Sequence, residues 1–165
     1  MDLTLPNHWS KLGVPIKFGK FRFESGQFKM ITNFSDADEG KDAVMISITN
    51  SPILVIDIDD INNSTEKFER LAQIHGGIEN LAYERTRNNG YHLFFYCEEK
   101  SKNILHKSFN GIFVDVIFKG SVFTAPSSWA GKKYEPGINS ILSISSLNQL
   151  PSLPEWIDDL LCLQD

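Results

Sequence analysis

The segment that decides the fold is Ser51-Pro-Ile-Leu-Val-Ile-Asp-Ile-Asp-Asp60, an unbroken aliphatic run that ends in acidic residues. Residues 53–56 are apolar at every position, which is typical of a strand covered on both faces, and Pro52 suits a strand's first residue. Side chains alternate along a strand, so Asp57 and Asp59 share a face, with Cα atoms roughly 6.6 Å apart at about 3.3 Å per residue. The segment therefore predicts a buried strand that carries two neighbouring carboxylates.

This carboxylate pair has two possible explanations. Neighbouring carboxylates at the end of an apolar strand repel one another and are expensive to desolvate, and a bound divalent cation would remove both costs. Alternatively, both side chains face water and begin the turn at residues 60–63, because Asp and Asn are common in turns. The Asp-x-Asp pattern alone leaves both explanations open.

The composition is that of one intracellular globular domain. The chain has 165 residues, of which 41% are hydrophobic and 22% are charged, a usual size and balance for a single domain with its own core. No apolar run is long enough to cross a membrane, and the first 15 residues lack the features of a signal peptide. We therefore expect a protein that is not secreted and has no membrane partner. Its two cysteines, Cys97 and Cys162, exclude a disulfide framework and a zinc site built on thiolates.

The charge pattern is compatible with a local nucleic-acid groove only. A net charge of −5 argues against a protein that grips nucleic acid over its whole surface. The basic residues form small clusters, namely Lys17, Lys20 and Arg22; Arg85 and Arg87; Lys100, Lys102, His106 and Lys107; Lys119; and Lys132 and Lys133. Each cluster is equally explained as a solvated face of the fold. Charge alone therefore selects no partner.

Hydrophobic patterns predict further strands interspersed with short helices. Before the central strand we predict a loop or turn at residues 7–10, a strand at 13–18, a hairpin at 21–28, a loop or short helix at 35–42 and a strand at 44–48. After it we predict a helix capped by Asn63 and stopped by Gly76, a turn at 85–90, strands at 91–97 and 112–118, a short helix at 100–108, and a closing helix opened by Pro154. The fold class is therefore α+β, a sheet covered by helices.

Two later strands carry isolated ionisable residues. Alternation in residues 91–97 places His92 on one face together with Phe94. Asp115 is the only polar residue of the strand at 112–118, and an ionised carboxylate in such a run needs a partner or a metal. An ion pair with Lys119 or with an arginine is the alternative to a metal.

Three elements occur in a characteristic order: Ile56-Asp-Ile-Asp59, Thr86-Arg-Asn-Asn-Gly-Tyr-His-Leu-Phe-Phe95, and Val114-Asp-Val-Ile-Phe-Lys-Gly-Ser-Val-Phe-Thr-Ala-Pro-Ser-Ser128. This order resembles the archaeo-eukaryotic primase superfamily, above all the primase-polymerase (Prim-Pol) domains of plasmids and of large-DNA-virus primase-helicases. In those domains an hhhDhD strand, an sxH motif and an hD strand make the active site. The resemblance covers nearly the whole chain. It implies a primase catalytic core with a mixed or antiparallel, RRM-like sheet covered by helices.

The resemblance assigns roles to particular residues. It implies that Asp57, Asp59 and Asp115 bind two divalent ions, Mg²⁺ or Mn²⁺, and that His92 contacts the triphosphate of the incoming nucleotide. The other nucleotide-binding candidates are Gly90, Arg85, Arg87, Lys119 and Ser127. Two positions depart from the family pattern. Asn88-Asn89-Gly90 replaces small-Gly-Gly, so that Gly90 stands in the serine place of sxH, and Asn50-Ser51 stands where relatives often show Thr-Gly.

The implied function is that of a DNA primase and DNA polymerase, which joins NTPs or dNTPs on a single-stranded DNA template. The resemblance further implies that residues 1–165 form the N-terminal domain of a longer primase-helicase, with a C-terminal helicase or other replication proteins as partners. There are two alternatives. One is a catalytically silent module that binds single-stranded nucleic acid, with Tyr91, Phe94 and Tyr96 as a stacking platform. The other is a metal-dependent nuclease. A third carboxylate, Asp115, favours an enzyme over a binding module. The absence of a His-x-His pair disfavours nucleases of the replication-initiator type.

Overall fold

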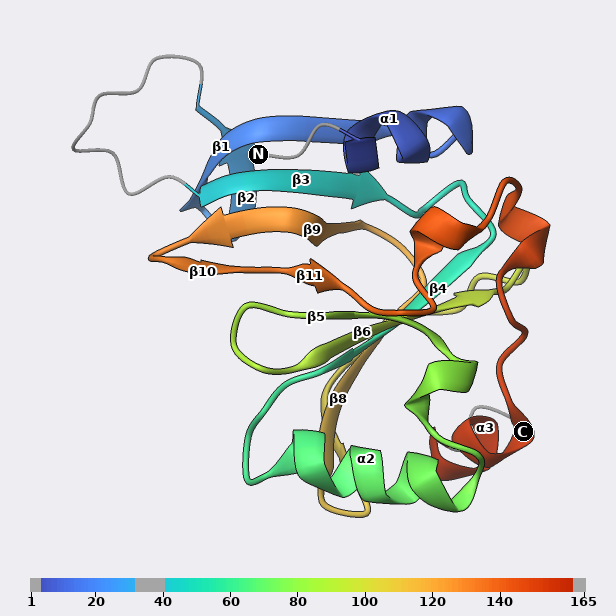
Figure 1. Ribbon diagram of the computed structural model, residues 1–165. Coiled ribbons are helices and arrows are strands. Elements are labelled where there is room, and N and C mark those ends of the chain that lie inside the picture. Colours follow the sequence, from blue (N-terminus) through green and yellow to red (C-terminus); the bar gives the residue numbers. More distant parts are fainter. Residues whose placement is uncertain (1–3, 32–40, 162–165) are drawn as a thin grey trace.

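The computed structural model describes residues 4–31 and 41–161, whose strands form two antiparallel sheets (Figure 1). Five strands form one sheet in the order β10-β9-β3-β1-β2, and six form the other in the order β11-β5-β6-β4-β8-β7. The strands are β1 Ile16–Glu24, β2 Gln27–Met30, β3 Lys41–Ser47, β4 Ile53–Ile58, β5 Ala82–Arg85, β6 Tyr91–Tyr96, β7 Ile104–Phe109, β8 Ile112–Ile117, β9 Ser121–Trp129, β10 Lys132–Lys133 and β11 Glu135–Pro136. The helices are α1 Thr4–Lys11, α2 Ser64–Ile74 and α3 Glu155–Leu161, with 3₁₀ turns η1 Ile78–Asn80, η2 Ile141–Ser143 and η3 Leu147–Gln149.

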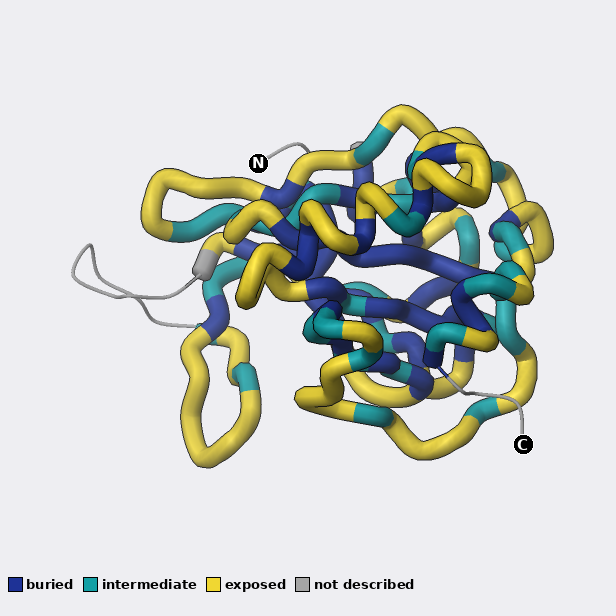
Figure 2. The backbone as a smooth tube through the Cα atoms, turned by 90° about the horizontal axis from the view of Figure 1, so that it is seen from below, coloured by how far each residue is buried: buried dark blue, intermediate teal, exposed yellow. Residues whose placement is uncertain are grey.

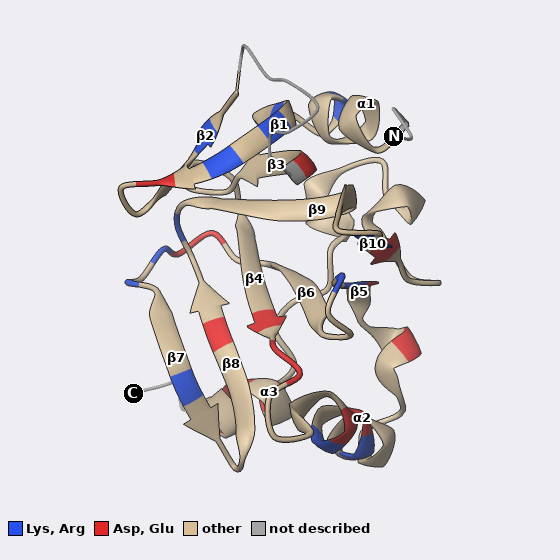
Figure 3. Cartoon of the chain, turned by 90° about the vertical axis from the view of Figure 1, so that its left-hand side faces the viewer, with Lys and Arg blue, Asp and Glu red and all other residues tan. Residues whose placement is uncertain are grey.

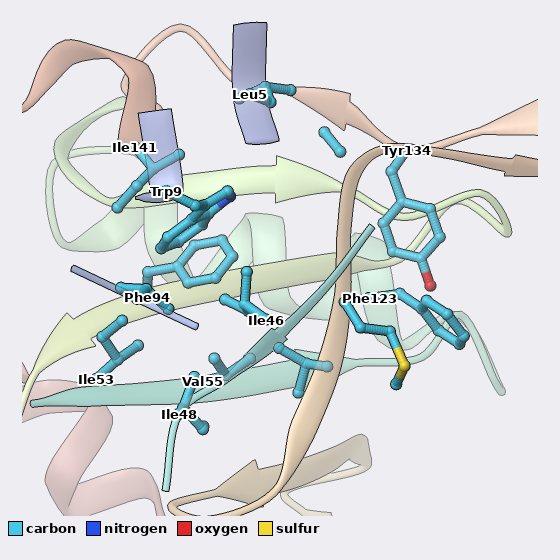
Figure 4. Close-up of a cluster of buried hydrophobic side chains, with 14 of the residues drawn as sticks. Leu5, Trp9, Ile46, Ile48, Ile53, Val55, Phe94, Phe123, Tyr134 and Ile141 are labelled. Atoms are coloured by element: carbon cyan, nitrogen blue, oxygen red, sulfur yellow. The ribbon is translucent and has the colours of Figure 1, made fainter. Parts of the chain in front are cut away.

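Two hydrophobic clusters hold these elements together. The first lies between the two sheets and includes Trp9 of α1, Ile46 of β3 and Phe94 of β6 (Figure 4). The second lies between the six-stranded sheet and helices α2 and α3, and includes Phe68 and Ile157. Full burial of one such side chain contributes about 1.5–3 kcal/mol, so these two clusters are the main source of stability.

Strand β4 runs through the centre of the six-stranded sheet and is covered on both faces, as predicted. Ile53 and Val55 enter the cluster between the sheets, whereas Leu54 and Ile56 enter the cluster against α2 and α3. All four side chains are at most 2% exposed. Figure 2 shows the buried stretches concentrated in the central strands, with exposed backbone around them. The strand thus fixes a rigid base for the acidic residues at its end.

Strands β1 and β2 form the hairpin predicted from the phenylalanine pattern. Ser25 and Gly26 both have positive φ, 50° and 77°, as a two-residue type I′ turn requires. The register pairs Phe23 with Phe28, whose ring centroids are 5.1 Å apart. The hairpin lies at the edge of the five-stranded sheet, where β2 has one neighbour only among the described strands.

Helices α2 and α3 cover the outer face of the six-stranded sheet, and both were predicted. The Trp156 ring of α3 lies against Phe68 and His75 of the α2 region, at centroid distances of 6.1 and 4.7 Å. The predicted cap at Asn63 is wrong in detail, because Asn63 adopts a left-handed conformation and its side chain makes no capping hydrogen bond. Among the described residues, no helix has the length and apolar character needed to cross a membrane.

Two segments fold differently from the prediction. Residues 7–10 belong to α1 rather than to a loop, since Leu5 and Trp9, four positions apart, are both buried on one helical side. Residues 100–108, predicted as a short helix, contribute to β7, an edge strand paired with β8. Most of β7 is exposed, so its sequence carries no alternating apolar pattern. The predicted loop or short helix at 35–42 falls largely outside the described residues, and β3 begins at Lys41.

The α+β class is confirmed, but one face of the six-stranded sheet is covered by a second sheet rather than by helices. Strand β3 pairs with both β1 and β9, and the resulting five-stranded sheet packs over β4 and β6 through the first hydrophobic cluster. Hydrophobic periodicity identifies strands, but it does not say which strands pair, because pairing joins residues far apart in the chain.

Candidate active site

A row of ionisable residues crosses four strands of the six-stranded sheet. Strand pairing places Glu84 of β5 opposite His92 of β6, His92 opposite Asp57 of β4, and Asp57 opposite Asp115 of β8. Residues directly opposite one another on antiparallel strands point to the same face. Here that face turns toward the five-stranded sheet, since Val55 and Phe94 of the same strands enter the cluster between the sheets. Figure 3 shows the acidic positions of β4 and β8 side by side below β9.

Three carboxylates meet at the open end of this row. Oxygens of Asp57, Asp59 and Asp115 all lie within 4.8 Å of one another. Desolvation, followed by the negative charges of Asp57 and Asp115, raises the pKa of Asp59 to about 6. Three like charges at this spacing are stable together only with protons or a cation between them. The predicted meeting of Asp57, Asp59 and Asp115 is therefore present in the fold.

A bulge in β7 fixes the orientation of Asp115. The β7–β8 register shifts between Ile104 and Lys107, and His106 has a positive φ of 56°. The backbone N–H of His106 thereby donates to Asp115 Oδ1 at 2.6 Å, and its Nδ1 lies 3.9 Å from the same oxygen. Among the described residues, the ion-pair neighbour of Asp115 is thus His106 and not Lys119 or an arginine. Sequence gave no signal for this contact, because a bulge in an exposed edge strand leaves no periodic pattern.

His92 is buried between two carboxylates. Its Nε2 lies 3.4 Å from Asp57 Oδ1, its Nδ1 lies 3.1 Å from Glu84 Oε1, and the residue is 4% exposed. Burial alone would lower the pKa of His92, but Asp57 and Glu84 outweigh burial and raise that pKa to about 10. His92 is therefore an imidazolium at neutral pH, with a fixed ring orientation.

Glu84 is the site residue that the sequence analysis missed. Its Oε2 accepts hydrogen bonds from the Thr124 hydroxyl at 2.8 Å and from the Ala125 N–H at 2.9 Å, while Oε1 faces His92. The carboxylate is 3% exposed and joins the two sheets. Glu84 lies two residues after Ala82, so both side chains point to the same face of β5, and Ala82 belongs to the cluster between the sheets. This spacing was the available signal in the sequence. That signal becomes informative only once β5 is known to pair with β6.

Gly90 lies where the backbone of β4 leaves no room for a side chain. A Cβ at this position would stand 2.2 Å from the Ile58 carbonyl oxygen and 2.8 Å from Thr86 Oγ1. The Gly90 N–H donates to Thr86 Oγ1 at 3.0 Å. A serine, which the family pattern places here, does not fit this backbone.

We accordingly expect Gly90→Ser to destabilise the domain, because the new Cβ must displace the backbone of Ile58, one residue before Asp59. Overpacking of this kind costs about 1–3 kcal/mol. Urea unfolding at pH 7 measures the change. Gly131→Ser is the matched control, since nothing lies within 4 Å of a Cβ there, although its positive φ of 74° brings its own smaller strain. Equal losses in both variants would contradict the steric explanation.

The two arginine candidates lie in different places. Arg85 Nη1 lies 3.0 Å from Glu69 Oε1, and its guanidinium is 4.2 Å from the Tyr91 ring centroid, on the α2 side of the sheet. Arg87 lies over the Trp129 ring at 4.6 Å, and its buried Nε has no hydrogen-bond partner among the residues that the structure describes. Trp129 belongs to β9, so Arg87 is the arginine that points toward the five-stranded sheet, as the carboxylates do.

Lys119 and Ser127 do not join the carboxylate cluster. Lys119 is exposed beyond the end of β8, and four residues of extended chain place its Cα roughly 13 Å from that of Asp115. Ser127 is fully buried, and its hydroxyl donates toward the Thr124 and Val44 carbonyl groups and accepts from the Val44 N–H. The fold thus brings together Asp57, Asp59, Asp115 and His92, with Gly90 at the turn beside them.

Comparison with known proteins gives one match. No curated protein and no solved structure matches the chain significantly. Residues 10–156 match the family model described as bifunctional DNA primase/polymerase, N-terminal. The match includes β4, β6 and β8 and therefore the three carboxylates and His92. The chain therefore belongs to the Prim-Pol family, whose members are DNA primases and polymerases that use divalent metals.

Proposed function

We propose that this chain is the catalytic domain of a DNA primase-polymerase that adds NTPs or dNTPs to a primer on a single-stranded DNA template. The observation that carries the proposal is the meeting of Asp57, Asp59 and Asp115 beside a buried histidine, which lies between Asp57 and Glu84. A sheet that serves only for packing gains nothing from this arrangement, because each of its charges needs compensation. Membership of the Prim-Pol family supports the same activity.

The three carboxylates suit hard divalent ions. All the donors are oxygens, which Mg²⁺ and Mn²⁺ prefer, and their spacing of at most 4.8 Å allows shared ligation. When bound, a pair of such ions would supply the positive charge that activates a 3′-hydroxyl and stabilises the departing pyrophosphate. Asp57 and Asp115 are fixed by their strands, and Asp59 follows β4 directly. The protein therefore holds two ligands rigidly and a third at the strand's open end.

The neighbouring residues complete a nucleotide site. His92 carries a positive charge beside Asp57, so we propose that it orients the triphosphate of the incoming nucleotide. Glu84 holds the His92 ring from the other side and acts as a positioning residue. Arg87, stacked on Trp129 and with an Nε that no described residue hydrogen-bonds, is the second phosphate candidate. Arg85, Lys119 and Ser127 are not included, because their positions separate them from this group.

Two wider features belong to the same proposal. The six-stranded sheet with α2 and α3 on one face is proposed as the catalytic core of the archaeo-eukaryotic primase superfamily, with β4 and β6 in its RRM-like element. A helicase, in the same or another chain, is proposed as the partner in replication. Both rest on the family resemblance and on the order of the motif-bearing strands.

A catalytically silent module that only binds single-stranded nucleic acid is less consistent with the fold than an enzyme is. Its platform would consist of Tyr91, Phe94 and Tyr96. Tyr91 and Phe94 are 4% and 1% exposed and enter different hydrophobic clusters, so they cannot stack bases together.

The direct test of the proposed enzymatic activity is incubation of the chain with single-stranded template, Mn²⁺ or Mg²⁺ and labelled nucleotides, with and without a primer. Incorporation supports the proposal, and its absence under all these conditions contradicts it.

Metal binding is expected to weaken below pH 6. The pKa of Asp59 is about 6, so this carboxyl is protonated below that pH, and the proton competes with the cation. Mn²⁺ affinity should fall about fivefold between pH 6 and 5 and change little between pH 7 and 8. Titration of Mn²⁺ by electron paramagnetic resonance at four pH values measures this. Constant affinity from pH 5 to 8 would show that Asp59 is not a ligand.

A further inference from the structure

A hollow with both apolar and polar walls lies beneath the β1–β2 hairpin. Its volume is about 720 Å³, and its lining includes Lys17 and Phe21 of β1, Phe28 of β2, Met45 of β3 and Ser121 of β9. Strand register places Lys17 opposite Met45, and Met45 opposite Phe123, so these side chains share one face of the five-stranded sheet. The volume lies in the range of pockets that bind small organic groups.

Aromatic and cationic side chains alternate along the hairpin. Phe23 is 61% exposed, and its ring contacts that of Phe28, which contacts Phe123 with centroids 4.7 Å apart. Ring contacts continue from Phe123 to Trp129 at 5.4 Å, then to Tyr134 and His92 at 5.6 Å each. An unbroken series of rings thus joins the exposed hairpin to the candidate active site.

The hairpin is also positively charged within an acidic protein. Residues 16–30 hold the cations Lys17, Lys20, Arg22 and Lys29 and one carboxylate, Glu24, whereas the whole chain carries −5. Arg22 and Lys29 both approach Glu24, at 3.7 and 4.0 Å. Figure 3 shows these basic positions along β1 and β2, above the strands that carry the acidic cluster.

We propose that the hairpin and the hollow beneath it bind unpaired bases of single-stranded DNA, the template strand, an inference that rests on the proposed function. Bases stack on the faces of Phe23 and Phe28, and Lys17, which strand alternation places on the same face, contacts a backbone phosphate. Duplex DNA presents phosphates but no base faces, so it has no use for the exposed rings. The series of ring contacts from Phe28 to His92 connects this surface to the candidate active site.

The stacking contribution is tested by fluorescence anisotropy of a labelled oligothymidylate with Phe23→Ala and Phe28→Ala. Each variant should bind at least fivefold more weakly, as expected when one stacked base loses its ring. Phe18→Ala is the matched control, because Phe18 is 50% exposed on the same strand but points to the opposite face. Unchanged binding in Phe23→Ala and Phe28→Ala, or an equal loss in Phe18→Ala, would overturn the proposal.

The phosphate contact is tested by salt dependence. Lys17→Ala should reduce the slope of log affinity against log salt by about 0.7, the value for one single-strand phosphate contact. Lys29→Ala is the matched control, because Lys29 pairs with Arg22 and points to the opposite face of the hairpin. An unchanged slope in Lys17→Ala, or an equal change in Lys29→Ala, overturns the proposal.

The same samples separate this inference from the proposed function. Primer extension with labelled nucleotides is measured alongside the crosslinking of an iodouracil oligonucleotide, followed by peptide mapping. Extension together with crosslinks in residues 16–30 supports both. If primers are extended but crosslinks fall only outside residues 16–30, the proposed hairpin surface is wrong and the proposed enzymatic function stands. If crosslinks fall in the hairpin but primers are not extended, the hairpin surface is supported and the enzymatic function is contradicted.

Discussion

Replacing Asp115 by Asn is expected to reduce nucleotide incorporation by at least about 10³-fold, because the change removes one of three metal-binding carboxylates. The fold should survive. Asn keeps an oxygen at the Oδ1 position, which can still accept the His106 N–H, and loss of one charge relieves repulsion on Asp59. We therefore expect the metal-free variant to be at least as stable as the wild type. Primer-extension rates and thermal unfolding without metal measure the two effects.

Asp60→Asn is the matched control for this variant. Asp60 is a neighbouring acidic residue outside the cluster, with its Oδ2 3.4 Å from Asn89 Nδ2. Its replacement should change incorporation by less than about threefold, since it removes charge but no proposed ligand. If Asp115→Asn retained full activity, or if both variants lost activity equally, Asp115 would not be a metal ligand.

Replacing Glu84 by Gln is expected to reduce the free energy of unfolding at pH 7 by about 3–5 kcal/mol, the range for breaking a buried ion pair. The Gln amide can still accept from Thr124 and Ala125, but its NH₂ group then faces the His92 Nδ1–H. The pKa of His92 should consequently fall, because one of the two carboxylates that raise it is gone. Urea unfolding and histidine NMR titration measure both changes.

The pH dependence of stability gives a second measure of the Glu84–His92 contact. The folded-state pKa of His92, about 10, lies above its unfolded value of about 6.5, so the stabilisation is complete below pH 6.5 and is lost as pH rises toward 10. Glu84→Gln should flatten this loss. Glu69→Gln is the control, since Glu69 pairs with Arg85 on the α2 side with a half-exposed side chain, and its loss should be under about 1 kcal/mol. A pH profile unchanged by Glu84→Gln would show that Glu84 does not hold the His92 proton.

The residues whose meeting in the fold the sequence predicted are those whose own strand is apolar. Asp57 and Asp115 stand out because every near neighbour in their strands is hydrophobic, and the face shared by His92 and Phe94 follows from alternation alone. The family motifs then placed these residues together. The central strand, the hairpin and both helices against the sheet were predictable for the same reason, since each has a strong local pattern.

What sequence could not provide depends on pairing between distant segments. Glu84 becomes a site residue only because β5 pairs with β6 and Thr124 comes from the other sheet. The His106 bulge exists because β7 is an edge strand, which the sequence analysis took for a helix. Ser127 lies close to its motif in sequence, yet β9 turns it into the sheet and away from the carboxylates. Chain order therefore predicted the clustering of the carboxylates better than their supporting contacts.

The most direct test of the account is the binding of Mn²⁺ to the chain, measured by electron paramagnetic resonance at pH 7.5 without nucleotide. The account predicts binding by the wild type and by Asp60→Asn, and a loss of at least tenfold in affinity in Asp57→Asn, Asp59→Asn and Asp115→Asn alike, because all three oxygens lie within 4.8 Å of one another. Equal Mn²⁺ affinity in the wild type and the three cluster variants would contradict a metal site at this position.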